Sequence, residues 1–351
     1  MSLLEVRNLR TSFFTDAGEV KAVNGISFNL ERGKVLGIVG ESGSGKSVTA
    51  YSIMQILAPT AKILPGSSIK LDGQELIGAG EKVMRKVRGN KISIIFQDPM
   101  TSLNPTYTIG HQLMEAIRLH TNRNKKEAYD RAVEMLRLVN VNEPLKRMNQ
   151  YPFELSGGMR QRVVIAMALA CEPDILIADE PTTALDVTIQ AQILELMNSL
   201  QKELGMAIIM ITHDLGVVAQ MCDEVIVMYA GSICEQGTAD EIFYNSCHEY
   251  TKGLIRSIPT TTSFGQKLKP ITGTPIDLLN MPAGCPFAPR CEAAMKICLR
   301  ERAESEAINE EHRAACWMNI KKGIEDGTIQ WKSSEDDQET VSDEEGGAEN
   351  E

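Results

Sequence analysis

YPFELSGGMRQRVVIAMALACEPDILIADEPTTALD, residues 151–186, is the stretch of this chain that decides its fold. A Ser-Gly-Gly turn, residues 156–158, comes directly before a helix with apolar periodicity. The apolar strand from Ile175 to Ala178 then delivers two adjacent carboxylates, Asp179 and Glu180. Because backbone N–H groups at a helix start bind anions, the stretch predicts two phosphate sites, one of them completed by a neighbouring molecule.

A second glycine-rich loop, GESGSGKS, follows the short apolar strand Val35–Val39 and precedes a helix predicted over Val48–Leu57. This strand–loop–helix context is what a phosphate-binding P-loop requires. Its glycines let consecutive N–H groups point inward as an anion nest. Lys46 is expected to reach the β- and γ-phosphates, and the Ser47 hydroxyl to ligate Mg²⁺. The predicted phosphate contacts are Gly40, Ser42, Gly43, Ser44, Gly45, Lys46, Ser47 and Val48.

Nucleotide hydrolysis needs groups that act on Mg²⁺ and on the attacking water. Asp179 has the position of the second carboxylate that organises Mg²⁺. Glu180 is the candidate to orient and polarise the water. Gln97 ends a neighbouring strand and is expected to touch Mg²⁺ or the water, and His213 follows a strand and is expected to contact the γ-phosphate.

Strands alternate with helices along most of the chain, which predicts a largely parallel sheet with helices on both faces. Residues 3–36 alternate like an antiparallel hairpin, and Asp72-Gly73 and Ala230-Gly231 are hairpin turn signals. A helical segment interrupts the α/β pattern, so a helical subdomain is predicted over about residues 98–160.

The motifs GESGSGKS, FQDP, LSGGM, ILIADE, TALD and ITHD occur in that order. Together they resemble an ATP-binding-cassette (ABC) ATPase, over about residues 3–258. The resemblance implies a P-loop ATPase fold with an antiparallel β-subdomain and a helical subdomain. It also implies a head-to-tail dimer with two ATP molecules at its interface, in which Ser156, Gly157 and Gly158 of one subunit clamp the γ-phosphate held by the other. Asp186 would be the D-loop residue that links the two sites.

Members of this family stack the adenine on an aromatic residue upstream of the P-loop. Phe13 and Phe14 are the candidates, and Phe13 is preferred because it shares a face with Leu9 and Thr11. A Phe on an amphipathic strand that simply packs in the core is the alternative interpretation.

The residue sequences of several motifs resemble those of the D-type ATPases of dipeptide and oligopeptide importers. DPMTSLNP, SGSGKSVTA, the stretch from LSGGM onward and TGTPIDLLNMPAGCPFAPRC carry this resemblance. It implies an F-type sister ATPase as the partner, two membrane permease subunits, and indirectly an extracellular peptide-binding protein. Residues 98–120 would contact the coupling helix of the membrane subunits. His248-Glu249 departs from the family pattern, which usually has Pro after the His.

Four of the eight cysteines cluster within 32 residues, at Cys285, Cys291, Cys298 and Cys316. Structural zinc sites prefer tight C-x2–4-C pairs, and these gaps are wider. Four thiolates without a tight pair suit an iron–sulfur cluster at least as well, and the resemblance implies a [4Fe–4S] cluster. Zinc and reduced structural thiols are the alternatives, with His312 as a substitute ligand. The cluster would either stabilise a small module that lacks a core of its own or sense the redox state.

Charge and composition set further bounds. Net charge is −11, but nine acidic residues and no basic ones lie between Ser333 and Glu351, which leaves the body near neutral and without a basic signature for nucleic acid. The predicted organisation is an ATP-binding domain (1–258), a linker (259–284), a four-cysteine module (285–330) and a disordered acidic tail (331–351). No signal peptide or membrane helix is predicted, so a peripheral place on the cytoplasmic face of the plasma membrane is expected.

Two other classes of function compete with peptide import. A non-transport ABC ATPase of the DNA-repair or translation type is disfavoured by the near-neutral body, the single cassette and the DPMTSLNP loop. A regulatory module without turnover would lack Glu180 or His213, and both are present. Among importers, nickel and oligosaccharide systems are the alternatives, because no residue of this chain is expected to contact the transported substrate.

Overall fold

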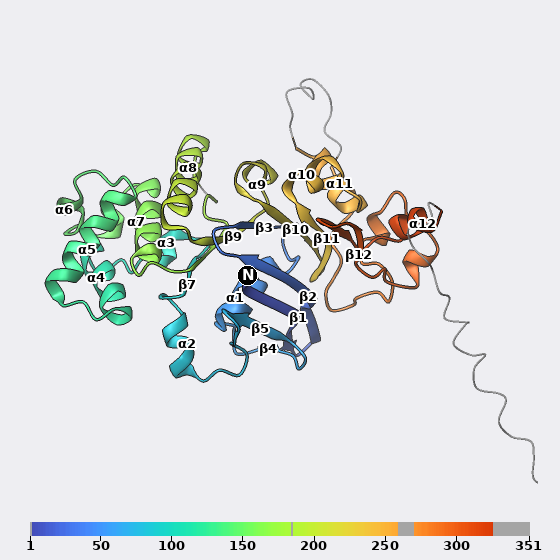
Figure 1. The fold of residues 1–351 in the computed structure, drawn as a ribbon, viewed down its shortest axis with the longest axis horizontal. Helices are drawn as coiled ribbons and strands as arrows, with labels where there is room; N and C mark the ends of the chain where they lie inside the picture. The colour runs from blue at the N-terminus through green and yellow to red at the C-terminus, as the bar shows by residue number, and fades with distance from the viewer. Residues whose placement is uncertain (1, 184, 259–269, 326–351) are drawn as a thin grey trace, which may run out of the picture.

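The computed structural model describes residues 2–183, 185–258 and 270–325. Figure 1 shows a helical lobe at one end, a central sheet with helices beside it, and the C-terminal hairpin and short helices at the other end. The predicted acidic tail, Ala184 and residues 259–269 of the predicted linker lie outside the described residues. None of the described helices combines the length and the hydrophobicity needed to cross a bilayer.

The central sheet has eight strands, and its middle is parallel as predicted. Its spatial order is β12 (Glu306–Asn309), β13 (His312–Ala314), β11 (Ser232–Thr238), β10 (Glu224–Tyr229), β3 (Val35–Val39), β9 (Ala207–Thr212), β8 (Ile175–Asp179) and β7 (Ile92–Ile95). The pairings from β10 to β7 are parallel, whereas those that join β11, β12 and β13 are antiparallel. The carboxyl ends of β3, β7, β8 and β9 therefore meet at one edge, where the predicted site residues follow.

Both faces of the parallel strands are buried, which explains their continuous apolar sequences. Along β3, Val35 and Val39 join one core and Leu36 and Ile38 join the other, because successive side chains point to opposite faces. The first core is covered by α8 (Val187–Leu204) and α9 (Leu215–Met221), and the second by α1 (Lys46–Met54) and the antiparallel sheet.

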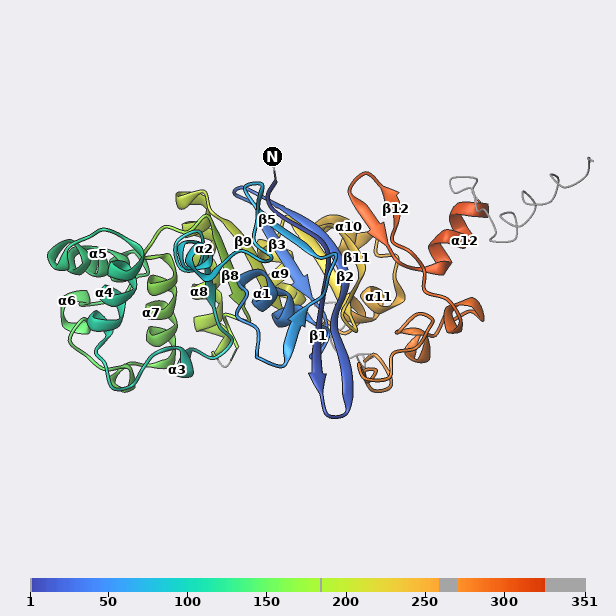
Figure 2. The ribbon, with the colours of Figure 1, turned by 90° about the horizontal axis from the view of Figure 1, so that it is seen from below.

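The antiparallel sheet contains the predicted N-terminal hairpin. It consists of β1 (Ser2–Thr15), β2 (Gly18–Glu31), β4 (Ala61–Ile63), β5 (Ser68–Leu71) and β6 (Gln74–Glu75). The predicted turn at Asp72-Gly73 is confirmed, with φ values of 46° and 79°. Ala230-Gly231 turns the β10–β11 hairpin in the same way, with φ values of 48° and 77°. Figure 1 shows this sheet and α1 on the side of the central sheet away from α8 and α9, and Figure 2 views the molecule from that side.

The helical lobe lies between β7 and β8 in the chain. Its elements are α3 (Pro99–Ser102), α4 (Ile109–His120), α5 (Lys125–Leu138), α6 (Pro144–Arg147), the 3-10 turn η1 (Pro152–Glu154) and α7 (Gly157–Leu169). Asn124 starts α5 with a reciprocal capping box to Glu127. The helix α7 packs against α3, α4 and α5, so the signature stretch joins this lobe to the central sheet.

The first helix, α1, is shorter than the sequence predicts. The first helix covers Lys46–Met54 rather than Val48–Leu57. It stops early because Gln55 takes a left-handed conformation with φ 50°, which ends a helix. Thr238 starts the helix Ala239–Tyr244, where its hydroxyl accepts from the N–H of Glu241, and the Glu241 carboxylate lies 3.2 Å from a ring nitrogen of His312. The remaining helices are α2 (Glu81–Val87), α10 (Ala239–Tyr244) and α11 (Glu249–Arg256).

The C-terminal residues pack on the cassette more closely than a linker and separate module predict. The hairpin β12–β13 extends the central sheet through β11. Ile276, Leu278 and Met281, inside the predicted linker, pack against the first core. The last part has the short turns η3 (Ala288–Arg290) and η4 (Ile297–Leu299), the helix α12 (Trp317–Glu325) and a small core of its own.

Candidate functional site

The loop Gly40–Ser47 requires glycine at two positions. Gly40 has φ 151° and Gly45 has φ 101°, and a β-carbon would collide with the Met228 carbonyl oxygen at the first and the Ala22 carbonyl oxygen at the second. Gly45 is also the residue that starts α1. The N–H groups of the first helical turn, at Lys46 to Val48, have no partner within their own helix. The loop therefore has the backbone of an anion site, with Ser42 and Gly43 at its exposed tip and Ser44 buried beneath it.

Lys46 lies buried inside this loop. Its ammonium group donates to the carbonyl oxygens of Gly40 at 2.8 Å and Glu41 at 3.0 Å. Burial lowers its pKa, and the nearby carboxylates of Glu180 and Asp179 oppose that shift. A phosphate oxygen offered to this ammonium group would supply the counter-charge that burial demands.

Ser47 and Asp179 meet as a metal-organising pair would. The Ser47 hydroxyl donates to the Asp179 carboxylate at 2.9 Å, and Tyr51 donates to its other oxygen at 3.2 Å. Burial raises the pKa of Asp179 in spite of these hydrogen bonds, and it raises the pKa of Tyr51 to about 12. Hydroxyl and carboxylate oxygens are the ligands that Mg²⁺ prefers, so this pair fits a Mg²⁺ ion.

Glu180 is held by three side chains, two of which, Gln97 and His213, are distant in the sequence. Its carboxylate accepts from Gln97 at 2.9 Å and Thr183 at 2.9 Å, and lies 3.1 Å from Nδ1 of His213. Burial alone would raise its pKa, but the bonds from His213 and Thr183 lower the pKa overall. The structure thus brings Gln97 and His213 to Glu180, the residue predicted to polarise the water, and the lowered pKa favours the ionised form that a base needs.

The backbone at Glu180 is strained. Its φ is 49°, a left-handed conformation that a residue with a side chain seldom adopts. A backbone hydrogen bond from its N–H to the Ile211 carbonyl oxygen, at 2.8 Å, holds it there. Strain of this kind, maintained by surrounding contacts, is typical of residues whose orientation matters for function.

The signature residues lie at the start of α7. Ser156 caps the helix, and its hydroxyl accepts from the N–H of Met159 at 3.4 Å. A β-carbon on Gly158 would come within 2.8 Å of Ile189, so that glycine allows α7 and α8 to approach. Gly157 instead faces open space, with only Leu185 at 4.0 Å. The exposed helix start therefore leaves room for an approaching anion at Ser156 and Gly157.

Two further contacts connect the signature helix with the residues after Glu180. Gln161 is fully buried, and its amide donates to the Pro181 carbonyl oxygen at 2.6 Å. Asp186 starts α8, where its carboxylate accepts from the N–H of Ile189 at 3.0 Å. The predicted D-loop residue thus has a local structural task at a helix start, beside the tip of α7.

The two candidates for adenine stacking differ in their surroundings. Phe13 is half-buried, and its neighbours Thr11 and Ser12 in β1 are both buried because the pairing with β2 shifts register there. Phe14 is 44% exposed and has the Lys62 ammonium group 5.7 Å from its ring centre. The assignment of Phe13 stays a prediction.

The four clustered cysteines come together in the C-terminal part. Burial raises the pKa of Cys291 to about 11, and the nearby thiols of Cys316 and Cys285 raise it further. Burial also raises the pKa of Cys316, and the nearby thiols of Cys285 and Cys298 act in the same direction. The N–H of Cys285 also donates to the Cys298 carbonyl oxygen at 2.8 Å. All eight cysteines are free thiols.

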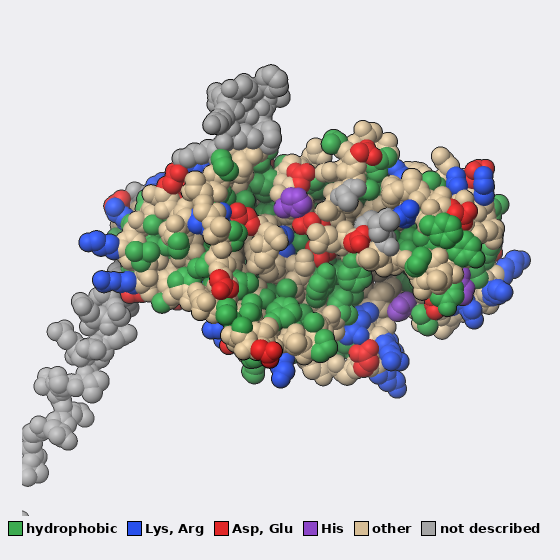
Figure 3. Space-filling model, turned by 180° about the vertical axis from the view of Figure 1, so that it is seen from behind, with side chains coloured by type: hydrophobic (Ala, Val, Ile, Leu, Met, Phe, Trp, Pro, Cys, Tyr) green, Lys and Arg blue, Asp and Glu red, His purple; other side chains and the backbone are tan. Residues whose placement is uncertain are grey.

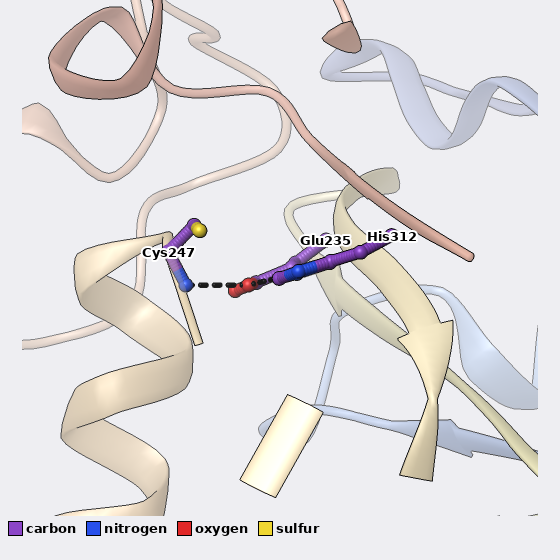
Figure 4. Close-up of side chains that lie close together, drawn as sticks. All are labelled: Glu235, Cys247 and His312. Carbon is purple, nitrogen blue, oxygen red and sulfur yellow. Dashed lines mark hydrogen bonds and ion pairs between the residues drawn. The ribbon is translucent and has the colours of Figure 1, made fainter. Parts of the chain in front are cut away.

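A different group of potential ligands, Glu235, Cys247 and His312, lies nearby (Figure 4). The buried Glu235 carboxylate accepts from the backbone N–H groups of Cys247 at 2.6 Å and His248 at 3.0 Å, and from the His312 ring at 2.7 Å. Burial alone would lower the pKa of His312, but Glu235 and Glu241 raise it. Burial raises the pKa of the Cys247 thiol to about 11.

Glu235 and Glu241 favour the protonated form of His312, and burial favours the neutral thiol of Cys247, and both of these forms are poor metal ligands. We therefore interpret Glu235 and His312 as a buried ion pair that fastens β13 to β11. Both ring nitrogens of His312 face carboxylates, at 2.7 Å and 3.2 Å. This disfavours His312 as a substitute ligand for the four cysteines.

Sequence reasoning missed several residues that contact the site. Tyr51 lies four residues after Ser47 on α1, so helical spacing places both on one face. Thr183 follows Glu180 by three residues in the same loop. Arg290 pairs with Glu41 across 249 positions of sequence, and no local signal announces that contact.

Comparison with known proteins agrees with this geometry. Residues 23–183 match the model of the family described as ABC transporter, and residues 234–298 match the oligopeptide/dipeptide transporter C-terminal region. The dimeric ATP-binding cassette MJ0796, solved in a post-hydrolysis state bound to ADP and Pi, is 27% identical, with a TM-score of 0.60. That match covers 67% of this chain and 98% of the cassette. The class of protein is thus an ABC ATPase.

Relatives define the group within this class. The dipeptide transport ATP-binding protein DppD of Bacillus subtilis is 52% identical over 91% of this chain and 96% of its own length. The oligopeptide transport ATP-binding protein OppD of Salmonella typhimurium is 51% identical over 91% of this chain and 95% of its own. The chain belongs to the DppD/OppD family of ABC transporter ATP-binding proteins.

Proposed function

We propose that this chain hydrolyses ATP to power the import of dipeptides or oligopeptides through a membrane ABC importer. The observation that carries the proposal is the convergence of Lys46, the Ser47–Asp179 pair and the Glu180 cluster at one edge of the central sheet. The cargo class rests on relatives named for dipeptide and oligopeptide transport.

Each of these residues has a task in the proposed reaction. The loop N–H groups and Lys46 would bind the β- and γ-phosphates, and Ser47 with Asp179 would hold Mg²⁺, with Gln97 nearby. Mg²⁺ would neutralise charge that develops on the phosphate oxygens. Glu180 would accept a hydrogen bond from the attacking water and polarise it. His213 would orient Glu180 and stabilise the charge that develops on the γ-phosphate.

A second subunit is needed for the complete site. The exposed start of α7, with Ser156, Gly157 and Gly158, would bind the γ-phosphate held by a partner, which we propose to be an F-type sister ATPase. In both views of the ribbon, α7 lies in the helical lobe at one end of the molecule, and α1 lies apart from it near the middle, beside the antiparallel sheet (Figures 1 and 2). This separation favours a head-to-tail pair in which each nucleotide lies between two chains.

The surface that transmits hydrolysis to the membrane subunits would include residues 98–120. A largely apolar cavity of about 310 Å³ lies between the helical lobe and the β7–α1 region. Its lining includes Ile56 and Phe96, which are exposed, and Ala116 and Met167 from the lobe. A short amphipathic helix of a permease subunit would suit such a groove. This contact would hold the chain peripherally on the cytoplasmic face of the plasma membrane.

Nucleic acid is a less suitable partner. On the face drawn in Figure 3, Lys and Arg side chains lie in small groups near the rim, and acidic side chains and a histidine lie near the middle. A continuous basic stripe, the feature typical of nucleic-acid binding, is not present on this face among the described residues.

Reconstitution tests the proposed function. In proteoliposomes with two permease subunits, the F-type ATPase and the peptide-binding protein, the chain is expected to give ATP hydrolysis that rises with peptide, together with peptide uptake. Omission of the permeases is the control and is expected to abolish uptake. Failure to assemble with the permeases, combined with DNA binding by the purified chain, would contradict peptide import. Uptake of nickel or oligosaccharide in place of peptide would correct the cargo.

We further propose that Cys285, Cys291, Cys298 and Cys316 hold a [4Fe–4S] cluster. Within the described part of the chain, only Glu235, Cys247 and His312 have three ligand atoms all within 4.8 Å of one another. A single zinc ion would need cysteine sulfurs about 3.8 Å apart, since Zn–S is about 2.3 Å. A cluster spreads its thiolates more widely because each binds a different iron. The four thiols are thus near one another, but not as near as zinc requires.

Metal analysis tests this assignment. Chain purified without oxygen is expected to be brown, with broad absorbance near about 400 nm and about four irons per chain. Cys291→Ser is expected to lose most of the iron and colour, whereas Cys171→Ser, at a cysteine outside the cluster, is expected to keep both. Colourless protein with stoichiometric zinc would assign the site to zinc instead.

A further inference from the structure

A bidentate ion pair connects the C-terminal part of the chain to the phosphate loop. The Arg290 guanidinium donates to the two carboxylate oxygens of Glu41 at 2.6 Å and 2.9 Å. The Arg290 side chain is 5% exposed and that of Glu41 is 27% exposed. Two parallel hydrogen bonds between charged groups, largely shielded from water, are among the stronger and more directional polar contacts in proteins.

The surroundings of Arg290 fix its orientation before it meets Glu41. Its Nε donates to the Thr272 carbonyl oxygen at 3.0 Å, and one terminal nitrogen lies 3.3 Å from the Tyr229 hydroxyl. The guanidinium also lies 5.8 Å from the ring centre of Tyr229 and 5.9 Å from that of Phe287. Its pKa is raised, first by the bond to Glu41, so it keeps its positive charge.

Glu41 is the second residue of the phosphate loop, and its main chain is held as firmly as its side chain. Its carbonyl oxygen accepts from Lys46 at 3.0 Å, and its N–H donates to the Tyr250 hydroxyl at 2.8 Å. Tyr250 is fully buried and packs edge-on against Tyr229. A displacement of the Glu41 side chain would therefore move a backbone group that contacts Lys46 directly.

Charge gives the pair a second effect. The Glu41 carboxylate lies near enough to influence the pKa of Lys46, so it also lies near where phosphates would bind. Without Arg290, this carboxylate would repel an incoming nucleotide, because like charges in a partly buried site interact strongly. Arg290 both neutralises the carboxylate and holds it in place.

Other C-terminal residues lie along the same side of the loop. A small cavity of about 100 Å³ is lined by Glu41 to Ser44 on one side and by Pro275, Ile276 and Leu278 on the other. This wall and the Arg290 contact come from one continuous segment, residues 272–290. The segment therefore supports the phosphate loop at two places.

From these contacts we infer that Arg290 is a positioning residue for the nucleotide site, acting through Glu41 on the backbone around Lys46. The C-terminal segment is thereby part of the ATP site. This inference rests on the proposed use of Gly40–Ser47 for ATP. Its effect falls on nucleotide affinity, because Arg290 does not contact the groups that act on the water.

The test compares single and double variants in the full chain. Arg290→Gln is expected to raise the Kd for Mg-ATP about tenfold, within the range of coupling between sites. In the assembled transporter, KM should rise by a similar factor while kcat changes less than about twofold. Glu41→Gln added to Arg290→Gln should restore the part of the affinity that the unpaired carboxylate costs, whereas the part lost because Glu41 is no longer held in place should remain lost. A purely structural role of Arg290 would give no such rescue.

Controls separate the possible failures. Arg256→Gln removes an exposed arginine that pairs with Glu249 at 3.4 Å, and should leave the Kd unchanged. Arg290→Lys keeps the positive charge but cannot make the two parallel hydrogen bonds to Glu41, so its Kd should be intermediate. This variant replaces Arg290→Gln in the test if a thermal unfolding assay shows that Arg290→Gln is unstable. Unchanged affinity in folded Arg290→Gln, with Lys46→Ala unable to bind, would overturn this inference alone. Unchanged affinity in Lys46→Ala would overturn the proposed ATP site itself.

Discussion

Replacement of Glu180 by glutamine is expected to arrest ATP hydrolysis while leaving ATP binding intact. Glutamine has the same shape and can still accept one hydrogen bond from Gln97 or Thr183, which both contact the Glu180 carboxylate at 2.9 Å. It cannot take a proton from water at neutral pH, nor polarise it with a negative charge. Since a general base contributes about 10²–10⁴-fold, turnover of the assembled transporter should fall about a hundredfold or more.

Binding should survive because Glu180 is not expected to hold the phosphates. Equilibrium binding of Mg-ATP and steady-state turnover, measured on the same preparation, check both halves of the prediction. Glu195→Gln, at an exposed position of α8, is the matched control and should change neither quantity. Near-normal turnover in Glu180→Gln would remove this residue from the catalytic role.

Replacement of Lys46 by alanine is expected to abolish measurable ATP binding. The ammonium group is buried among loop carbonyl oxygens and would meet the β- and γ-phosphates. Loss of one partner from a buried charged contact costs about 2–5 kcal/mol, and each 1.4 kcal/mol is about tenfold in affinity. The Kd for Mg-ATP should therefore rise about 30-fold to several thousand-fold.

The measurement is a titration with Mg-ATP, together with thermal unfolding of the nucleotide-free chain. Unfolding must be followed because Lys46 also holds the loop through Gly40 and Glu41. Lys34→Ala is a suitable control, since Lys34 forms an exposed ion pair with Asp223 at 3.2 Å. Unchanged affinity in a folded Lys46→Ala protein would contradict the P-loop assignment.

Much of the phosphate site was predictable because its parts are local in sequence. A strand, a glycine-rich loop and a helix follow one another, so Gly40, Lys46 and Ser47 could be given tasks from spacing alone. The parallel topology brings the ends of neighbouring strands to one edge. That rule is enough to place Gln97, Asp179, Glu180 and His213 together, and the structure confirms that Glu180 contacts Gln97 and His213.

Contacts between distant segments escaped prediction. The β12–β13 hairpin continues the central sheet because Glu235 and His312 form a buried ion pair, and periodicity says nothing about such a pair. In the sequence, Arg290 likewise has no feature that distinguishes it from other basic residues; it simply lies between Pro289 and Cys291. Its importance comes from packing against Tyr229 and Glu41, which only the folded chain brings together.

Helix ends were predicted less well than helix positions. The end of α1 depends on the left-handed conformation of Gln55, a residue type that gives no stop signal. Gly158 shows the reverse case, in which a motif residue has a structural reason of its own. A side chain there would press on Ile189, so packing as well as ligand binding requires glycine.

The hydrogen bond from Gln161 to the Pro181 carbonyl oxygen links two parts of the chain that would serve different nucleotides. It ties the helix that would face a partner's nucleotide to the loop that follows this chain's own Glu180. A movement of that loop would strain this buried contact and so would be transmitted to α7. In the head-to-tail pair proposed above, this hydrogen bond would couple the two nucleotide sites, because each chain would contribute α7 to one site and Glu180 to the other.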